Sequence, residues 1–308
     1  MDISSALPTF VITLREGVEA TLVIGIVLAY LDSAGRSQLN RWVYWGIAAG
    51  LVGSVGIGVL LNQALMALES SNQPYAAVIK PLLVAVFGVV AIVLLSWMLI
   101  WMTQQAKSLK SDIQDSVSRA LEQSRGWGIF SLIAVTVLRE GFETVIFISA
   151  QFQEGWLPVA GAMLGLLGAT GIGVLLFQFG IRINLRRFFQ VLGLLLLFIV
   201  AGLFTGTLRH ADEAATALAY TVPQFSNLCS GSEACILGPQ VWDLSRVLPD
   251  SRFPGVLLRT FFGYTQTLYL AQAIGYVSFL AIVGGQYLQT LFPPARKGAG
   301  EPGDSTAR

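Results

Sequence analysis

Charged residues are scarce in this chain, and their scarcity excludes an ordinary soluble fold. Only 12% of the 308 residues are charged, while 54% are hydrophobic. Soluble domains carry about 25% charged residues. The formal net charge of +1 gives no electrostatic reason to expect a nucleic-acid partner. The composition therefore predicts an all-α integral membrane protein.

Histidine and cysteine are also nearly absent, with one and two copies. A site for Cu(I) or structural zinc needs these residues. The chain has no HExxH motif, no Ser/His pair and no P-loop, so we expect neither an enzyme nor an enzymatic cofactor, and no direct use of ATP. Cys229 and Cys235 lie six residues apart, a spacing compatible with a local disulfide or with two free thiols.

Long apolar stretches dominate the remaining sequence. A membrane-spanning helix needs about 20 mostly apolar residues. Seven stretches meet that requirement, at residues 7–31, 42–68, 79–102, 128–152, 156–181, 188–208 and 262–292. The sequence predicts one membrane domain over residues 1–292 and a disordered cytoplasmic tail over residues 293–308.

The distribution of basic residues predicts the orientation of these helices. Of the 19 Lys and Arg residues, 12 fall on one side of the membrane and five on the other, if the seven helices alternate in direction. The positive-inside rule then places the N-terminus outside, the C-terminus in the cytoplasm, and residues 209–255 outside. The N-terminus lacks the basic region of a cleavable signal peptide.

Charged residues occur twice in the middle of these apolar stretches. The sequence REGVE covers residues 15–19, and REGFE covers residues 139–143. On a helix the two glutamates of each copy share a face, and each arginine can pair with the glutamate four residues later. Because charges at bilayer depth are costly, such residues are candidates for a functional site.

The two copies belong to a longer internal repeat. GLVGSVGIGVLL at residues 50–61 matches GLLGATGIGVLLFQ from Gly165. Residues 7–102 would form one repeat, residues 128–208 the other, and helix seven at 262–292 would stand alone. Since each repeat has three helices, the second would cross the membrane in the opposite sense, a plan that recurs in secondary transporters.

Two crossing REGxE helices would bring four carboxylates and two guanidiniums together, a net charge of −2 that suits a multivalent cation. Oxygen ligands favour hard ions such as Mg²⁺, Ca²⁺, Mn²⁺ and ferric iron. There are two alternatives to a cation site: the carboxylates could form a proton relay, or the Arg–Glu pairs could only hold two helices together. The candidate ligands are Glu16, Glu19, Glu140 and Glu143, and the candidate pairing residues are Arg15 and Arg139.

The doubled REGxE, together with VWDLSRVLPDSRFPGVLLRTFFGY at residues 241–264, resembles the high-affinity iron permeases. These include the fungal permease that works with a multicopper ferroxidase and the bacterial EfeU-type permease. The resemblance covers about residues 7–292. It implies iron uptake across the plasma (inner) membrane, with the four glutamates as iron ligands and the two arginines as their partners. Iron would be a transported substrate; the alternative is another hard cation, such as Mn²⁺, or protons.

The same resemblance implies an external ferroxidase, peroxidase or iron-binding protein as a partner. Asp212 and Glu213, just beyond predicted helix six, are candidates for receiving iron from it. A solvated loop of balanced charge is the simpler interpretation. Family helix seven often has Pro after its Gly-Tyr pair, whereas Gly263-Tyr264 is followed by Thr265 here, so the local shape of that helix is open.

Overall fold

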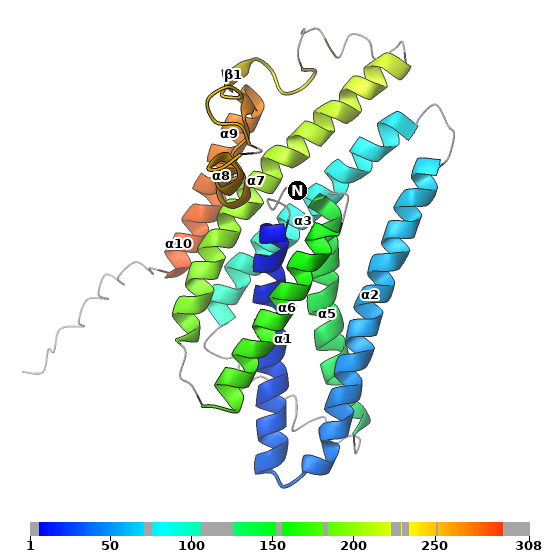
Figure 1. Ribbon diagram of the computed structural model, residues 1–308, viewed down its shortest axis with the longest axis vertical. Coiled ribbons are helices and arrows are strands. Elements are labelled where there is room, and N and C mark those ends of the chain that lie inside the picture. Colours follow the sequence, from blue (N-terminus) through cyan, green and yellow to red (C-terminus); the bar gives the residue numbers. More distant parts are fainter. Residues whose placement is uncertain are drawn as a thin grey trace, which may run out of the picture.

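The protein is a bundle of long helices that run side by side (Figure 1). The computed structural model describes residues 6–70, 76–105, 126–151, 156–180, 184–222, 229, 234–250 and 252–291. The long helices are α1 (Ala6–Ser33), α2 (Asn40–Ser70), α3 (Ala76–Gln105), α5 (Trp127–Gln151), α6 (Leu157–Phe177) and α7 (Leu185–Thr221). A short 3-10 turn, η2 (Ser37–Leu39), joins α1 to α2. The predicted tail at 293–308 lies outside the described residues.

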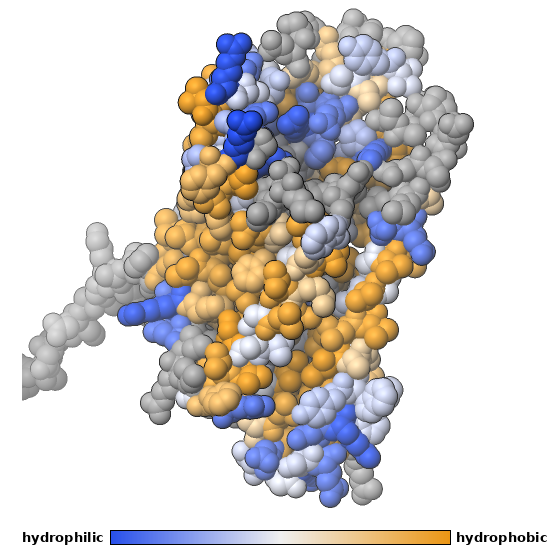
Figure 2. Space-filling model, in the orientation of Figure 1, coloured by the Kyte–Doolittle hydropathy of each residue, from blue (hydrophilic) through white to orange (hydrophobic). Residues whose placement is uncertain are grey.

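The surface of the bundle is suited to a lipid environment. Figure 2 shows hydrophobic residues across the middle of one face and hydrophilic residues toward both ends. Within the described part of the chain, five helices are long and apolar enough to cross a membrane. They cover Ser37–Ala64, Val78–Trp101, Leu157–Phe177, Arg187–Thr221 and Leu270–Leu291. Helices α1 and α5, with 28 and 25 residues, also have the length, but each carries the three charges of one REGxE copy.

The C-terminal region differs from the prediction of one helix over 262–292. Helix α8 (Gly255–Phe262) ends at Gly263, whose φ of 66° is left-handed and suits glycine. The chain then forms strand β2 (Thr267–Tyr269), which pairs antiparallel with β1 (Gln240–Asp243). The last span begins only at α9 (Leu270–Phe279) and continues through a π-helical turn, η4 (Leu280–Gly284), into α10 (Gly285–Leu291).

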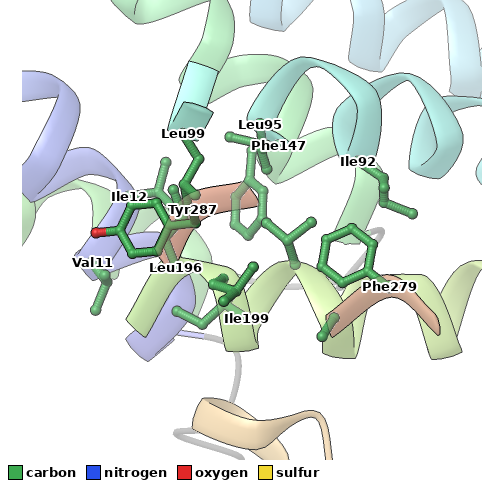
Figure 3. Close-up of a cluster of buried hydrophobic side chains, with 13 residues drawn as sticks. Val11, Ile12, Ile92, Leu95, Leu99, Phe147, Leu196, Ile199, Phe279 and Tyr287 are labelled. Atoms are coloured by element: carbon green, nitrogen blue, oxygen red, sulfur yellow. The ribbon is translucent and has the colours of Figure 1, made fainter. Parts of the chain in front are cut away.

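A hydrophobic core joins this last span to the rest of the bundle (Figure 3). Tyr287 of α10 is 1% exposed, and its hydroxyl donates a hydrogen bond of 3.0 Å to the carbonyl of Gln190 on α7. The ring shares one buried cluster with Ile12 of α1, Leu99 of α3 and Phe147 of α5. The core therefore lies between the two REGxE helices and the last span, and it fixes their positions.

Candidate functional site

The site forms where α1 and α5 approach each other within the bundle. Helix α1 contacts both α5 and α6, and α5 contacts both α1 and α2. The glycine of each REGxE copy allows a close approach to a neighbouring helix. A Cβ at Gly17 would lie 2.6 Å from the Cβ of Ala169 on α6, and one at Gly141 would clash with Ser54 on α2. Small residues in these contacts allow the helices that carry the glutamates to pack closely against α6 and α2.

Arg15, the first residue of the first copy, is buried, with a side chain only 3% exposed. Its Nη1 lies 2.8 Å from Glu16 Oε1, and its Nη2 lies 3.2 Å from Glu19 Oε1. The planar guanidinium can grip two carboxylates at once, which a lysine ammonium cannot do in the same geometry. Arg15 therefore holds the two glutamates of its own helix in fixed positions.

Three carboxylates from two helices converge beside Arg15. Glu16, Glu19 and Glu140 each offer an oxygen, and the three oxygens lie within 4.8 Å of one another. Among the described residues, no hydrogen-bond donor reaches Glu16 Oε2 or Glu140 Oε2, both of which are buried. Buried polar atoms are normally paired, so two such oxygens in one cluster need a cation or a shared proton to supply the missing interactions.

The second copy is arranged differently from the first. Arg139 Nε lies 3.1 Å from Glu143 Oε1, but the Arg139 side chain is 51% exposed. Its guanidinium carbon lies 5.7 Å from the ring centroid of Trp101 on α3, within cation–π range. Glu143 is not part of the three-carboxylate cluster. The structure thus brings together three of the four predicted ligands and leaves the fourth paired with Arg139.

Glu143 borders a small cavity between α3 and α5. The cavity has a volume of about 10 Å³, which is about the space that one water molecule needs. Its other walls are apolar and come from Ala91, Leu94, Leu95, Ile146 and Phe147. Glu143 is therefore the polar group of an otherwise apolar pocket beside the carboxylate cluster.

The charge balance of this centre favours a bound cation. Three neighbouring carboxylates repel one another in a medium that screens poorly, and Arg15 offsets only one of their charges. A multivalent cation would offset the remainder and would bind the oxygens directly. The donor set, formed of carboxylate oxygens alone, suits a hard ion.

Two residues of this centre lay outside the predicted site. Met98 on α3 belongs to no motif, yet Arg15 Nη1 lies 3.1 Å from its sulfur. Nothing in the sequence indicated that Trp101 would lie at the site, apart from its position about one helical turn after Met98. By contrast, the intramembrane Gln272 and Tyr276 bond to backbone carbonyls, of Thr205 at 3.1 Å and Phe262 at 2.7 Å. These two polar groups brace the last span against its neighbours.

The predicted entrance residues do not lie beyond the helix, as the sequence predicted, but inside α7, which continues to Thr221 because the residues after 208 are partly polar but rich in Ala, which favours a helix. Asp212 Oδ1 accepts hydrogen bonds from the backbone amides of Ile236 and Leu237, at 2.5 and 3.2 Å. Glu213 lies 3.5 Å from Arg209 Nε and 2.9 Å from His210 Nδ1, and it is 49% exposed. Asp212 therefore fastens the following segment to α7, whereas Glu213 faces solvent.

The same segment is closed by a disulfide between Cys229 and Cys235. Of the two alternatives left open by the sequence, the structure shows the disulfide. Thr216 on α7 donates a hydrogen bond of 3.4 Å to the sulfur of Cys235. A disulfide is typical of an oxidising compartment.

Comparison with known proteins identifies the family. The model of the iron permease FTR1 family matches residues 6–289. The chain belongs to this family. The resemblance drawn from the doubled REGxE is thereby confirmed.

Three relatives cover most of the chain. One is an uncharacterized protein of Synechocystis sp., 44% identical over 294 residues, which are 94% of this chain and 96% of that protein. The ferrous iron permease EfeU of Escherichia coli O6:K15:H31 is 33% identical over 264 residues, with coverage of 83% and 86%. EfeU of Yersinia pestis is 29% identical over 295 residues, with coverage of 94% and 95%. No solved structure matches the chain.

Proposed function

We propose that this permease carries iron across the membrane by binding it between the two REGxE helices, near the bilayer midplane. The observation that carries the proposal is the cluster of Glu16, Glu19 and Glu140, with two buried oxygens that lack partners in the described structure. Family membership supplies the identity of the ion. Relatives named as ferrous iron permeases favour iron over Mn²⁺ or protons.

Glu143 is the fourth ligand in this proposal, and it acts in a different conformation. Here it pairs with Arg139, which also lies over Trp101. Release of this pair would free Glu143 to join the three-carboxylate cluster when iron arrives or leaves. Arg15, buried between Glu16 and Glu19, would keep its own carboxylates oriented throughout.

In this proposal the protein has seven membrane spans, six of which form an inverted repeat of three helices each. Helices α1 and α5 would be the two further spans, since both exceed the length that a bilayer requires. The glycine contacts support the repeat: Gly17 and Gly141 are equivalent in sequence, and so are their neighbours Ala169 and Ser54. Helix α1 packs on α6, and α5 packs on α2. A two-fold axis that relates α1 to α5 would also relate α6 to α2, and so would produce these two equivalent contacts.

The permease would lie in the plasma (inner) membrane with its N-terminus outside. Support comes from the 12-to-5 split of basic residues and from the disulfide in the segment after α7. Glu213, exposed beside that segment, is the more suitable of the two entrance candidates. An external ferroxidase, peroxidase or iron-binding protein would deliver iron at this end.

Uptake into liposomes by purified protein tests the proposal. Ferrous, ferric and manganese ions would be compared for the wild type and for the single variants Glu16→Gln, Glu19→Gln and Glu140→Gln. Loss of one ligand should lower iron uptake more than about tenfold, since even indirect changes around a metal commonly cost 10- to 100-fold. Asp32→Asn, a carboxylate of α1 outside the cluster, is the matched control and should transport normally.

Circular dichroism and gel filtration would verify that each variant is folded. Wild-type iron uptake by a folded Glu19→Gln, Glu140→Gln double variant would show that the cluster does not bind the transported ion. Faster uptake of manganese than of either iron species would favour the alternative substrate.

A further inference from the structure

A second, larger cavity opens at the end of the bundle where α2 and α5 begin. Its volume is about 540 Å³, within the range of about 300–1,000 Å³ that is typical of ligand pockets. Arg41, Trp42, Trp45, Trp127 and Phe130 line it. In Figure 1 the starts of these helices lie at the opposite end of the molecule from β1. Neither the carboxylate cluster nor the proposed transport accounts for this cavity.

The aromatic walls of the cavity are built by mutual packing. The rings of Trp127 and Phe130 stack with centroids 4.8 Å apart. Trp42 meets Trp127 and Phe130 edge-on, at 6.3 and 6.5 Å. Gly126, with a φ of 152°, lies so close to the Trp42 indole that a side chain there would clash. The three rings therefore form one packed surface, in which Trp127 is still 63% exposed, and Trp45 beside it is 67% exposed.

Arg41 gives this apolar surface a positive charge. The residue is exposed, and its guanidinium carbon lies 5.9 Å from the ring centroid of Trp42. None of the ion pairs found between described residues involves Arg41. A guanidinium binds phosphate through two parallel hydrogen bonds, and an uncompensated one at an aromatic cavity is suited to an anionic ligand.

The position of the cavity along α2 indicates the kind of anion. The apolar span that includes α2 runs over Ser37–Ala64, so Arg41 and Trp42 lie at its boundary with the polar connection to α1. Tryptophan is enriched at this depth because its ring suits the headgroup region. A free phosphate would use only the arginine, whereas a lipid would also place its glycerol and acyl chains against the rings.

We propose that this cavity binds an anionic phospholipid. Arg41 holds the phosphate, and Trp42, Trp45 and the Trp127–Phe130 stack hold the apolar part of the lipid. Basic pockets between membrane helices commonly recognise acidic headgroups in this way. Because the cavity spans the starts of α2 and α5, the bound lipid joins the helix that carries REGFE to its neighbour.

Native mass spectrometry of the purified full chain tests this proposal without reference to iron. Phosphatidylglycerol and phosphatidylcholine with identical acyl chains are the probes. Arg41→Gln should weaken phosphatidylglycerol binding about tenfold or more, the effect expected for a lost charge-assisted hydrogen bond. Trp45→Ala should weaken it as well. Both residues are exposed, so their replacement leaves the core intact.

Two exposed residues outside the cavity serve as matched controls. Arg36→Gln removes a nearby arginine from the connection between α1 and α2, and Trp97→Ala removes a tryptophan of α3 that is 72% exposed. Both controls should bind phosphatidylglycerol within about twofold of the wild type, a change of less than 1 kcal/mol.

Several results would overturn the proposal. Equal losses in Arg41→Gln and Arg36→Gln would indicate general surface charge. Equal binding of phosphatidylcholine, which carries the same phosphate without a net charge, would show that the cavity does not select anionic lipids. Displacement of the lipid by inorganic phosphate at equal concentration would identify a simple anion site. A dimer that dissociates on Trp45→Ala would assign the cavity to a contact between two copies of the chain.

Discussion

Two identical arginines of the REGxE copies have different surroundings. Arg15 is enclosed by Glu16, Glu19 and the sulfur of Met98. Arg139 is half-exposed, pairs with Glu143 and lies over Trp101. The difference follows from α3, which presents a thioether to one arginine and an indole to the other. At the scale of single residues, the two halves of the site are therefore not equivalent.

This difference predicts unequal effects of the same substitution. Arg15→Lys should lower iron uptake at least about tenfold, because one buried ammonium cannot replace two charge-assisted hydrogen bonds. Arg139→Lys should change uptake less than about fivefold, because an exposed ion pair contributes about 0–1 kcal/mol. Uptake normalised to the amount of inserted protein is the measurement. Equal losses in the two variants would contradict the asymmetry.

Asp212 and Glu213, the two acidic residues of α7, should also differ in their response to substitution. Asp212→Ala removes the acceptor for two backbone amides and should lower the free energy of unfolding by about 1–3 kcal/mol. Glu213→Gln should leave stability unchanged and reduce uptake only when iron is scarce. Denaturation curves and uptake at low and high iron would be compared. Normal uptake by Glu213→Gln at low iron would return this residue to the role of a solvated side chain.

The sequence predicted part of this residue-level arrangement. The i, i+3 spacing was sufficient to place Glu16 and Glu19 on one helical face, and the motif copies suggested that Glu140 would join them. The outward position of Arg139 depends on Trp101, which comes from a third helix and follows no motif. A pattern local to one helix cannot specify which side chain a distant helix places opposite it.

At the scale of elements, the bounds of most long helices follow from the apolar stretches: 7–31 and 42–68 correspond to α1 and α2, because long apolar stretches are read directly from hydrophobicity. The stretch at 188–208 was too short, since α7 continues through polar residues to Thr221. The region at 262–292 was less predictable. Gly263 stops α8, and the pairing of β1 with β2 depends on residues far apart in sequence, so apolar content alone suggested one continuous helix.

The helix contacts around the motif predict which glycines are essential. Gly17→Ala and Gly141→Ala should each destabilise the protein by about 1–3 kcal/mol, since each new methyl group would overlap a neighbouring helix. Gly56→Ala and Gly171→Ala, where a Cβ would meet nothing within 4 Å, are the matched controls. Thermal unfolding in detergent is the measurement.

Partner substitutions distinguish packing from other causes in this experiment. Ala169→Gly should restore part of the stability lost in Gly17→Ala, because it removes the methyl group that is overlapped. Ser54→Gly should do the same for Gly141→Ala. Failure of both partner substitutions would show that the glycines are needed for backbone freedom and not for close helix contact.

At the scale of the whole molecule, the fold places a polar centre within an apolar bundle and a disulfide-closed segment at one end. The two ends should therefore face different compartments. Val247→Cys, on the surface beyond β1, should react with an impermeant thiol reagent applied to intact cells. Ala34→Cys, in the connection between α1 and α2, should be protected until the membrane is permeabilised. The reverse labelling pattern would invert the proposed orientation.

We propose that Glu16, Glu19 and Glu140 together bind the transported iron. Equilibrium iron binding by the purified chain in nanodiscs tests it most directly, with Glu140→Gln compared against Asp32→Asn. We expect one high-affinity ion in the wild type and in Asp32→Asn, and binding weakened more than about tenfold in Glu140→Gln. Wild-type affinity in a folded Glu140→Gln variant would contradict it.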